Sequence, residues 1–133
     1  MTFLLDTNIC IYALKQNHAV LARLLAQRPI EVSISVITEA ELRTGAAKSA
    51  SAAKTMRLLD NFLRPLTVVE FTSADAVAYA AVRAKLERAG TPIGPLDTLI
   101  ASQAVARKLT LVSNNVREFK RIAGLQLENW ASA

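Results

Sequence analysis

Apolar residues along the chain gather in short runs that are bounded by polar or turn-forming residues. Three of the four main runs are mostly apolar rather than alternating, a pattern typical of parallel strands covered on both faces. The predicted strands span residues 2–5, 31–35, 66–71 and 109–113, with a candidate fifth strand at 126–128.

The stretches between these runs have helical periodicity. Residues 8–15 and 19–28 form one or two helices, and further helices are predicted at 36–48, 52–63, 73–89, 96–108 and 116–121. Strands that alternate with helices predict an α/β fold, a three-layer sandwich with a central, mainly parallel sheet of four to five strands flanked by helices. We expect one domain over residues 1–133, with ligands bound at the carboxyl ends of the strands.

Composition narrows the class of protein. The chain has 133 residues, of which 52% are hydrophobic and 20% are charged, as expected for an ordered globular protein. A single cysteine, Cys10, excludes an internal disulfide, and the first apolar run is interrupted by Asp6 and has no basic leader. We therefore expect a cytoplasmic protein that does not enter a membrane. The net charge of +5 favours a polyanionic partner such as nucleic acid.

Asp6 ends the first predicted strand and is followed by Thr7 and Asn8. One of these residues could cap the next helix, since all three types are suited to that position. A cap needs only one of them, however, and a carboxylate at a strand end points toward the ligand-binding edge. Asp6 is therefore both a helix-cap candidate and a metal-ligand candidate.

Two carboxylates lie close together in the helix predicted at 36–48. Glu39 has Arg43 four residues later, the favourable order for a surface ion pair. Glu41 instead has Ile37 and Gly45 at that spacing, so that its side of the helix is apolar and small. A carboxylate there is costly unless it meets a cation or hydrogen-bond donors. Glu41 is the better ligand candidate, and Glu39 is the alternative.

Two further polar positions lie at predicted element ends. Asp97 follows Pro95 at a helix start, where it could either compensate the helix dipole or bind a cation. Ser113 and Asn115 follow the strand at 109–113 and could cap the next helix or bind water or phosphate. Carboxylates that converge in this way repel one another unless a cation neutralises them, and oxygen ligands favour Mg²⁺ or Mn²⁺ over zinc.

Four segments of the chain resemble those of PIN-domain nucleases, and more narrowly those of VapC-like toxins of bacterial toxin–antitoxin pairs. They are LDTN (residues 5–8), ITEAELRTG (37–45), PIGPLDTLIA (92–101) and LVSNNVREF (111–119), and the closing LENW (127–130) is also similar. The order and spacing of the four segments carry the resemblance, which covers nearly the whole chain.

The resemblance implies an endoribonuclease that depends on Mg²⁺ or Mn²⁺. Its acidic centre falls on Asp6, Glu41 and Asp97, with Thr7 in a supporting position and Asn115 where many PIN domains have a further acid. The implied substrate is tRNA, and the ending of the fourth segment suggests the anticodon stem-loop of initiator tRNA. A VapB-like antitoxin and a homodimer are the implied partners.

Candidate roles follow for the remaining polar residues. Ser113 could orient water or the scissile phosphate together with Asn115. The basic side chains of Arg43, Arg117 and Lys120 are candidates for binding the RNA backbone.

Two other functions are compatible with parts of the sequence. A PIN-like module that binds RNA or protein without catalysis would account for Asn115 in place of an acid. A phosphoryl-transfer enzyme with Asp6 as nucleophile is disfavoured, because the haloacid-dehalogenase pattern needs a second aspartate where this chain has Asn8.

Overall fold

The computed structural model describes residues 1–131 and contains a parallel sheet in the order β3-β2-β1-β4-β5. The strands in this part of the chain are β1 (Phe3–Leu5), β2 (Val32–Ser35), β3 (Thr67–Val69), β4 (Thr110–Val112) and β5 (Gln126–Glu128). The helices over the same residues are α1 (Thr7–Leu14), α2 (His18–Leu25), α3 (Val36–Ala47), α4 (Ala52–Leu63), α5 (Ser73–Arg88), α6 (Pro95–Arg107) and α7 (Val116–Phe119), with a 3₁₀ turn, η1, at Pro29–Glu31.

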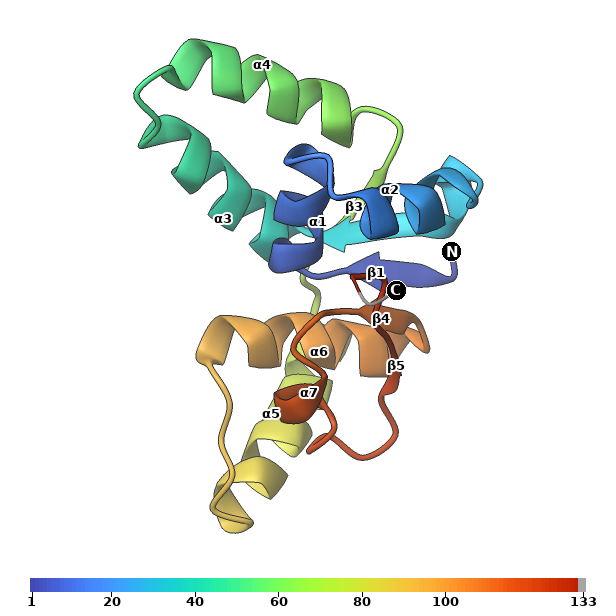
Figure 1. Cartoon of the computed structure of the whole chain (residues 1–133). Helices are drawn as coiled ribbons and strands as arrows, with labels where there is room; N and C mark the ends of the chain where they lie inside the picture. Colours follow the sequence, from blue (N-terminus) through green and yellow to red (C-terminus); the bar gives the residue numbers. More distant parts are fainter. Residues whose placement is uncertain (132–133) are drawn as a thin grey trace.

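The sheet is covered on both faces. Helices α1 to α4 lie on one side of it and α5 to α7 on the other (Figure 1). The two layers have separate cores, because neighbouring residues of β1 point to opposite faces: Leu5 packs with Ile9 and Val20, whereas Leu4 packs with Ile100 and Phe119. The predicted three-layer α/β sandwich is confirmed, with five parallel strands among the described residues.

Several element boundaries differ from the sequence prediction, and two of the differences have a clear cause. The third strand is Thr67–Val69 rather than 66–71, because within residues 1–131 it pairs only with β2, which ends at Ser35 opposite Val69. The second strand begins at Val32, since Pro29 starts a 3₁₀ turn that includes Glu31. The first helical stretch, predicted as one or two helices, is two: Gln16 has a positive φ of 62°, and the Asn17 side chain caps α2.

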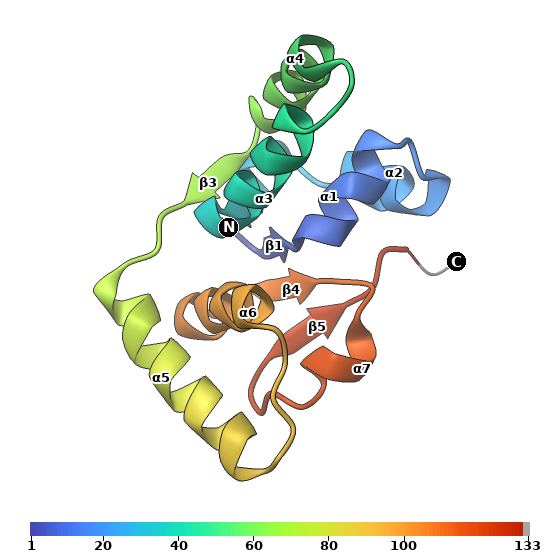
Figure 2. The same cartoon turned by 90° about the vertical axis from the view of Figure 1, so that its left-hand side faces the viewer.

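Two features of the outer layers matter for the site. The α3–α4 hairpin reaches beyond the sheet, and α5 runs away from it before residues 89–94 bring the chain back to α6 (Figure 2). Among residues 1–131, no helix is long and apolar enough to cross a membrane.

Candidate active site

Asp6 lies at the carboxyl end of β1, the central strand, and is only 3% exposed. Its carboxylate accepts a hydrogen bond from the backbone N–H of Ile9 at 2.9 Å and therefore caps α1. The hydroxyl of the fully buried Ser113, which follows β4, also hydrogen-bonds to it. Asp6 thus has the structural role considered above, and its side chain also faces the end of the sheet where β1 and β4 meet.

Glu41 lies on α3 and is half-buried. The Thr7 hydroxyl donates to Glu41 Oε1 at 2.6 Å and also lies 3.3 Å from the hydroxyl of the buried Thr38. Thr7, the residue after Asp6, therefore fixes the position of the Glu41 carboxylate. This contact explains how a carboxylate is accommodated on the inner side of α3.

Glu39 has the surface role predicted for it. Its carboxylate accepts a hydrogen bond from Arg43 Nε at 2.8 Å, and Arg43 also contacts Asp60 at 3.1 Å. The Arg43 guanidinium contacts two carboxylates, so binding an RNA backbone would require it to leave both of them. The choice of Glu41 over Glu39 agrees with these contacts.

Asp97 lies in the first turn of α6 and is half-buried. Its Oδ2 is 3.8 Å from the point where Gly94 would carry a Cβ. The chain entering α6 therefore passes close to this carboxylate.

The three carboxylates interact electrostatically although they come from distant parts of the sequence. Burial raises the pKa of Asp6 to about 6, and the negative charges of Asp97 and Glu41 add to this effect. Burial also raises the pKa of Asp97, with further contributions from Glu41 and Glu118. The structure thus brings together Asp6, Glu41 and Asp97, which we call the acidic cluster.

Glu118 is a residue that the sequence reasoning missed. It lies on α7, one helical turn after Asn115, and its charge acts on Asp97. Asn115, the expected fourth corner, donates its backbone N–H to the Ser113 hydroxyl at 2.9 Å. Glu118 follows Asn115 by three residues, a spacing that puts both on the same side of α7 and could have identified Glu118 from the sequence.

The acidic cluster offers the oxygen ligands that Mg²⁺ and Mn²⁺ prefer. No three His, Cys, Asp or Glu side chains within residues 1–131 are already arranged as a cage for one ion. Two of the carboxylates are instead held by donors of the chain itself, Asp6 by Ile9 N–H and Glu41 by Thr7. The mutual repulsion and burial of these groups nevertheless fit a cation, which would replace an unfavourable arrangement of like charges.

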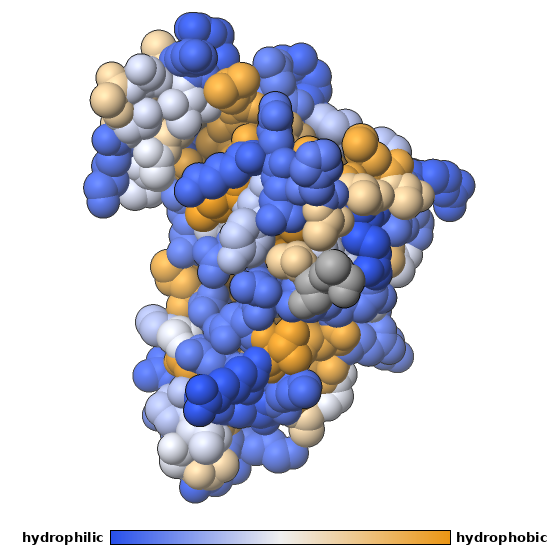
Figure 3. Space-filling view, in the orientation of Figure 1, coloured by the Kyte–Doolittle hydropathy of each residue, from blue (hydrophilic) through white to orange (hydrophobic). Residues whose placement is uncertain are grey.

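An apolar groove of about 790 Å³ runs beside the acidic cluster. It lies between α1 and α2 on one side and α3 and α4 on the other, and Glu41 is among its lining residues. Hydrophobic side chains gather in the hollow between α4 and α1 (Figure 3). The exposed Leu58 and Gly45 of α3 also line this groove, which we call the helical groove.

Comparison with known proteins agrees with this architecture. A PIN domain family matches residues 3–125. The tRNA(fMet)-specific endonuclease VapC of Shigella flexneri is 37% identical over 131 residues, covering 98% of this chain and 99% of that protein. Ribonuclease VapC2 of Rickettsia felis is 42% identical over 133 residues, covering 98% of each.

Solved structures give the same result. The crystal structure of DNA-bound VapBC from Salmonella typhimurium superposes with a TM-score of 0.93 at 37% identity, covering 98% of each chain. The family match spans both helical layers of the sandwich and all three segments that supply the acidic cluster. The chain belongs to the PIN-domain family and, within it, to the VapC ribonucleases.

Proposed function

We propose that the chain is the toxin of a type II toxin–antitoxin pair and hydrolyses RNA phosphodiester bonds with Mg²⁺ or Mn²⁺. The acidic cluster is the observation that carries this proposal, because it gathers three carboxylates at the carboxyl end of a parallel sheet. The substrate we propose is tRNA in the cytoplasm, and specifically initiator tRNA, for which the Shigella relative is named. Within that tRNA we propose the anticodon stem-loop, which the ending of the segment at residues 111–119 suggests.

Asp6, Glu41 and Asp97 would hold the cation, and we propose Glu118 as a fourth acid because its charge acts on Asp97. When bound, such a cation neutralises charge that develops on the phosphate and lowers the pKa of the attacking water. The ordered donors of the chain, Thr7 to Glu41 and Ser113 to Asp6, keep these carboxylates oriented.

The chain's own residues perform the proton transfer in this proposal. Glu41 would accept a proton as the water oxygen bonds to phosphorus, and the leaving oxygen would take a proton from solvent as its bond to phosphorus breaks. The Thr7 hydroxyl holds the carboxylate that accepts the proton. Asn115, at the start of α7, is available to orient the scissile phosphate.

The helical groove is the surface that we propose for a VapB-like antitoxin. Its apolar lining suits an amphipathic helix, and Glu41 at its edge would place part of that partner beside the acidic cluster. The Salmonella and Rickettsia neighbours are VapBC assemblies. We also propose that the toxin forms a homodimer.

Incubation of the purified chain with total tRNA tests the catalytic proposal. We expect cleavage with Mg²⁺ and none with EDTA. Asp97→Asn should lower the rate about 100-fold or more, because it removes a ligand whose ion supplies several kcal/mol of transition-state stabilisation.

The matched control is Glu39→Gln, a carboxylate change on the opposite side of α3 and outside the cluster. Cleavage that persists in EDTA would refute the metal-dependent mechanism. Retained RNA binding without any cleavage would favour the non-catalytic binding module instead. Mapping the cleavage site in the RNA products identifies which tRNA is cut.

A further inference from the structure

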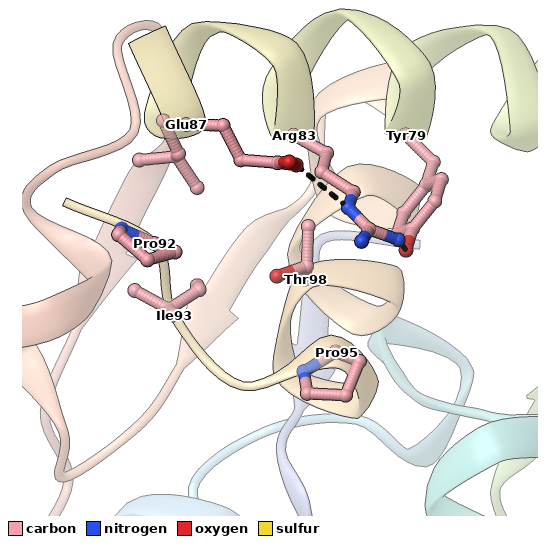
Figure 4. Close-up of a pocket in the computed structure, with 8 residues that line it drawn as sticks. Tyr79, Arg83, Glu87, Pro92, Ile93, Pro95 and Thr98 are labelled. Carbon is pink, nitrogen blue, oxygen red and sulfur yellow. Dashed lines mark hydrogen bonds and ion pairs between the residues drawn. The ribbon is translucent and has the colours of Figure 1, made fainter. Parts of the chain in front are cut away.

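A second pocket, of about 280 Å³, lies on the other side of the sheet from the helical groove. Tyr79, Arg83 and Glu87 of α5 form one wall. Pro92, Ile93 and Pro95, on the segment that leads into α6, form the opposite wall (Figure 4). We call this the α5–α6 pocket.

The α5–α6 pocket adjoins the acidic cluster. Gly94 lies between two of its lining residues, Ile93 and Pro95, and approaches the carboxylate of Asp97. Thr98, which also lines the pocket, donates its hydroxyl proton to the carbonyl oxygen of Gly94 at 2.8 Å. A ligand in the pocket would therefore touch the same short segment that packs against Asp97.

The wall formed by α5 offers flat surfaces and both kinds of hydrogen-bonding group. Arg83 lies 5.9 Å from the centre of the Tyr79 ring and donates to the Tyr79 hydroxyl oxygen at 2.8 Å. Its Nε donates to Glu87 Oε2 at 2.9 Å. The Tyr79 hydroxyl proton, a guanidinium nitrogen and the second Glu87 oxygen stay available to a ligand.

We propose that the α5–α6 pocket binds one unpaired RNA nucleotide next to the cleaved bond, an inference that rests on the proposed nuclease function. Its volume is below the roughly 300–1,000 Å³ of most small-molecule sites, which suits one nucleotide rather than a helical segment. Sequence-selective RNA binding stacks splayed bases on aromatic rings and guanidinium planes while their edges form hydrogen bonds.

The charges of the pocket are compatible with this ligand. The Arg83–Glu87 pair is exposed, with 56% and 52% of the side-chain surfaces accessible. Such a pair contributes little to stability, so Arg83 can exchange it for a base edge or a phosphate. Glu87 can in turn accept hydrogen bonds from the amino or imino groups of a base.

Fluorescence anisotropy tests the pocket without requiring catalysis. It measures, in EDTA, the binding of short single-stranded oligoribonucleotides of mixed sequence. Tyr79→Ala should weaken binding roughly 5- to 150-fold, the range for loss of one stacked base. Arg83→Ala should weaken it as well, whereas Tyr79→Phe, which keeps the ring, should bind within about threefold of the unchanged chain. The matched control is Arg88→Ala, an exposed arginine on the same helix outside the pocket.

Cleavage of a tRNA with single abasic substitutions around the cut site then locates the nucleotide. One abasic position should slow the unchanged chain strongly and have little further effect on Tyr79→Ala, because both changes remove the same contact. Equal RNA binding by the unchanged chain, Tyr79→Ala and Arg83→Ala would overturn the pocket and leave the nuclease function standing. Weakened binding by both variants, in a chain that cleaves no RNA, would support the pocket and refute the nuclease function.

Discussion

Replacing Asp6 by Asn should stabilise the fold near neutral pH while removing metal-dependent cleavage. Asp6 is 3% exposed, and burial is the largest reason for its raised pKa. An Asn side chain at this position can still accept the hydrogen bond from Ile9 N–H, since Asn is an equally good helix cap. Its amide can donate to the Ser113 hydroxyl, which has two acceptor positions.

The expected gain follows from the pKa of Asp6, which is about 6 in the folded chain against an ordinary value of 3.8. At about 1.36 kcal/mol per pKa unit, the charged carboxylate destabilises the fold by about 3 kcal/mol. The folded state holds the proton more tightly than the unfolded state. The destabilising contribution of Asp6 is therefore absent below pH 3.8 and grows until the pH has risen through about 6.

Thermal unfolding in EDTA measures this effect. With an unfolding entropy of about 2.1 cal/mol/K per residue, about 3 kcal/mol corresponds to a Tm rise of roughly 10 °C for Asp6→Asn near neutral pH. At about pH 4 the variant and the unchanged chain should have similar Tm values. The control Asp60→Asn changes an exposed carboxylate on α4 and should shift stability by less than about 0.5 kcal/mol.

Added Mg²⁺ supplies the second half of the experiment. Mg²⁺ that binds the folded state should raise the Tm of the unchanged chain, whereas the Tm of Asp6→Asn should not change. A variant that is less stable than the unchanged chain near neutral pH in EDTA would refute the reasoning. A stability difference between the unchanged chain and Asp6→Asn that stays constant between about pH 4 and pH 7 would refute it too.

Three further predictions concern the surroundings of the acidic cluster. Thr7→Val removes the donor to Glu41 and should slow tRNA cleavage roughly 10- to 100-fold at saturating Mg²⁺, and an unaltered rate would contradict the orienting role. Glu118→Gln removes a like charge beside Asp97, so the apparent pKa of Asp97 in a pH titration should fall and more Mg²⁺ should be needed for half-maximal cleavage. An unshifted Mg²⁺ dependence would exclude Glu118 from the site. Gly45→Leu fills open space in the helical groove and should weaken antitoxin binding about tenfold or more in calorimetric titration, with tRNA cleavage retained. Gly45→Ala is its matched control, and equal antitoxin affinity of the two variants would place the partner elsewhere.

The fold could be predicted because parallel strands buried on both faces leave a strong apolar signal. Leu4 and Leu5 are both fully buried, one in each core, so the strand at residues 3–5 has no polar position that could be mistaken for a surface. Strand ends were less predictable. The length of β3 depends on where β2 stops, and this pairing is not visible in local sequence.

Part of the site could be read from local spacing. Glu39 was separated from Glu41 because an ion pair four residues apart is a local feature of a helix. Glu118 was not predicted as a site residue, because an acid in the first turn of a helix is already explained by the helix dipole. Its effect on Asp97 depends on tertiary packing. The α5–α6 pocket has no local signal either, since its two walls meet only when the segment at residues 91–95 folds back along α5.

We have proposed that the acidic cluster binds the cation that drives RNA cleavage. The most direct test measures Mn²⁺ binding and tRNA cleavage on the same protein. We expect the cleavage rate of the unchanged chain to rise in proportion to Mn²⁺ occupancy, and Asp97→Asn to lose both binding and cleavage while keeping its fold. Full cleavage by Asp97→Asn, or cleavage by the unchanged chain before any Mn²⁺ is bound, would contradict this.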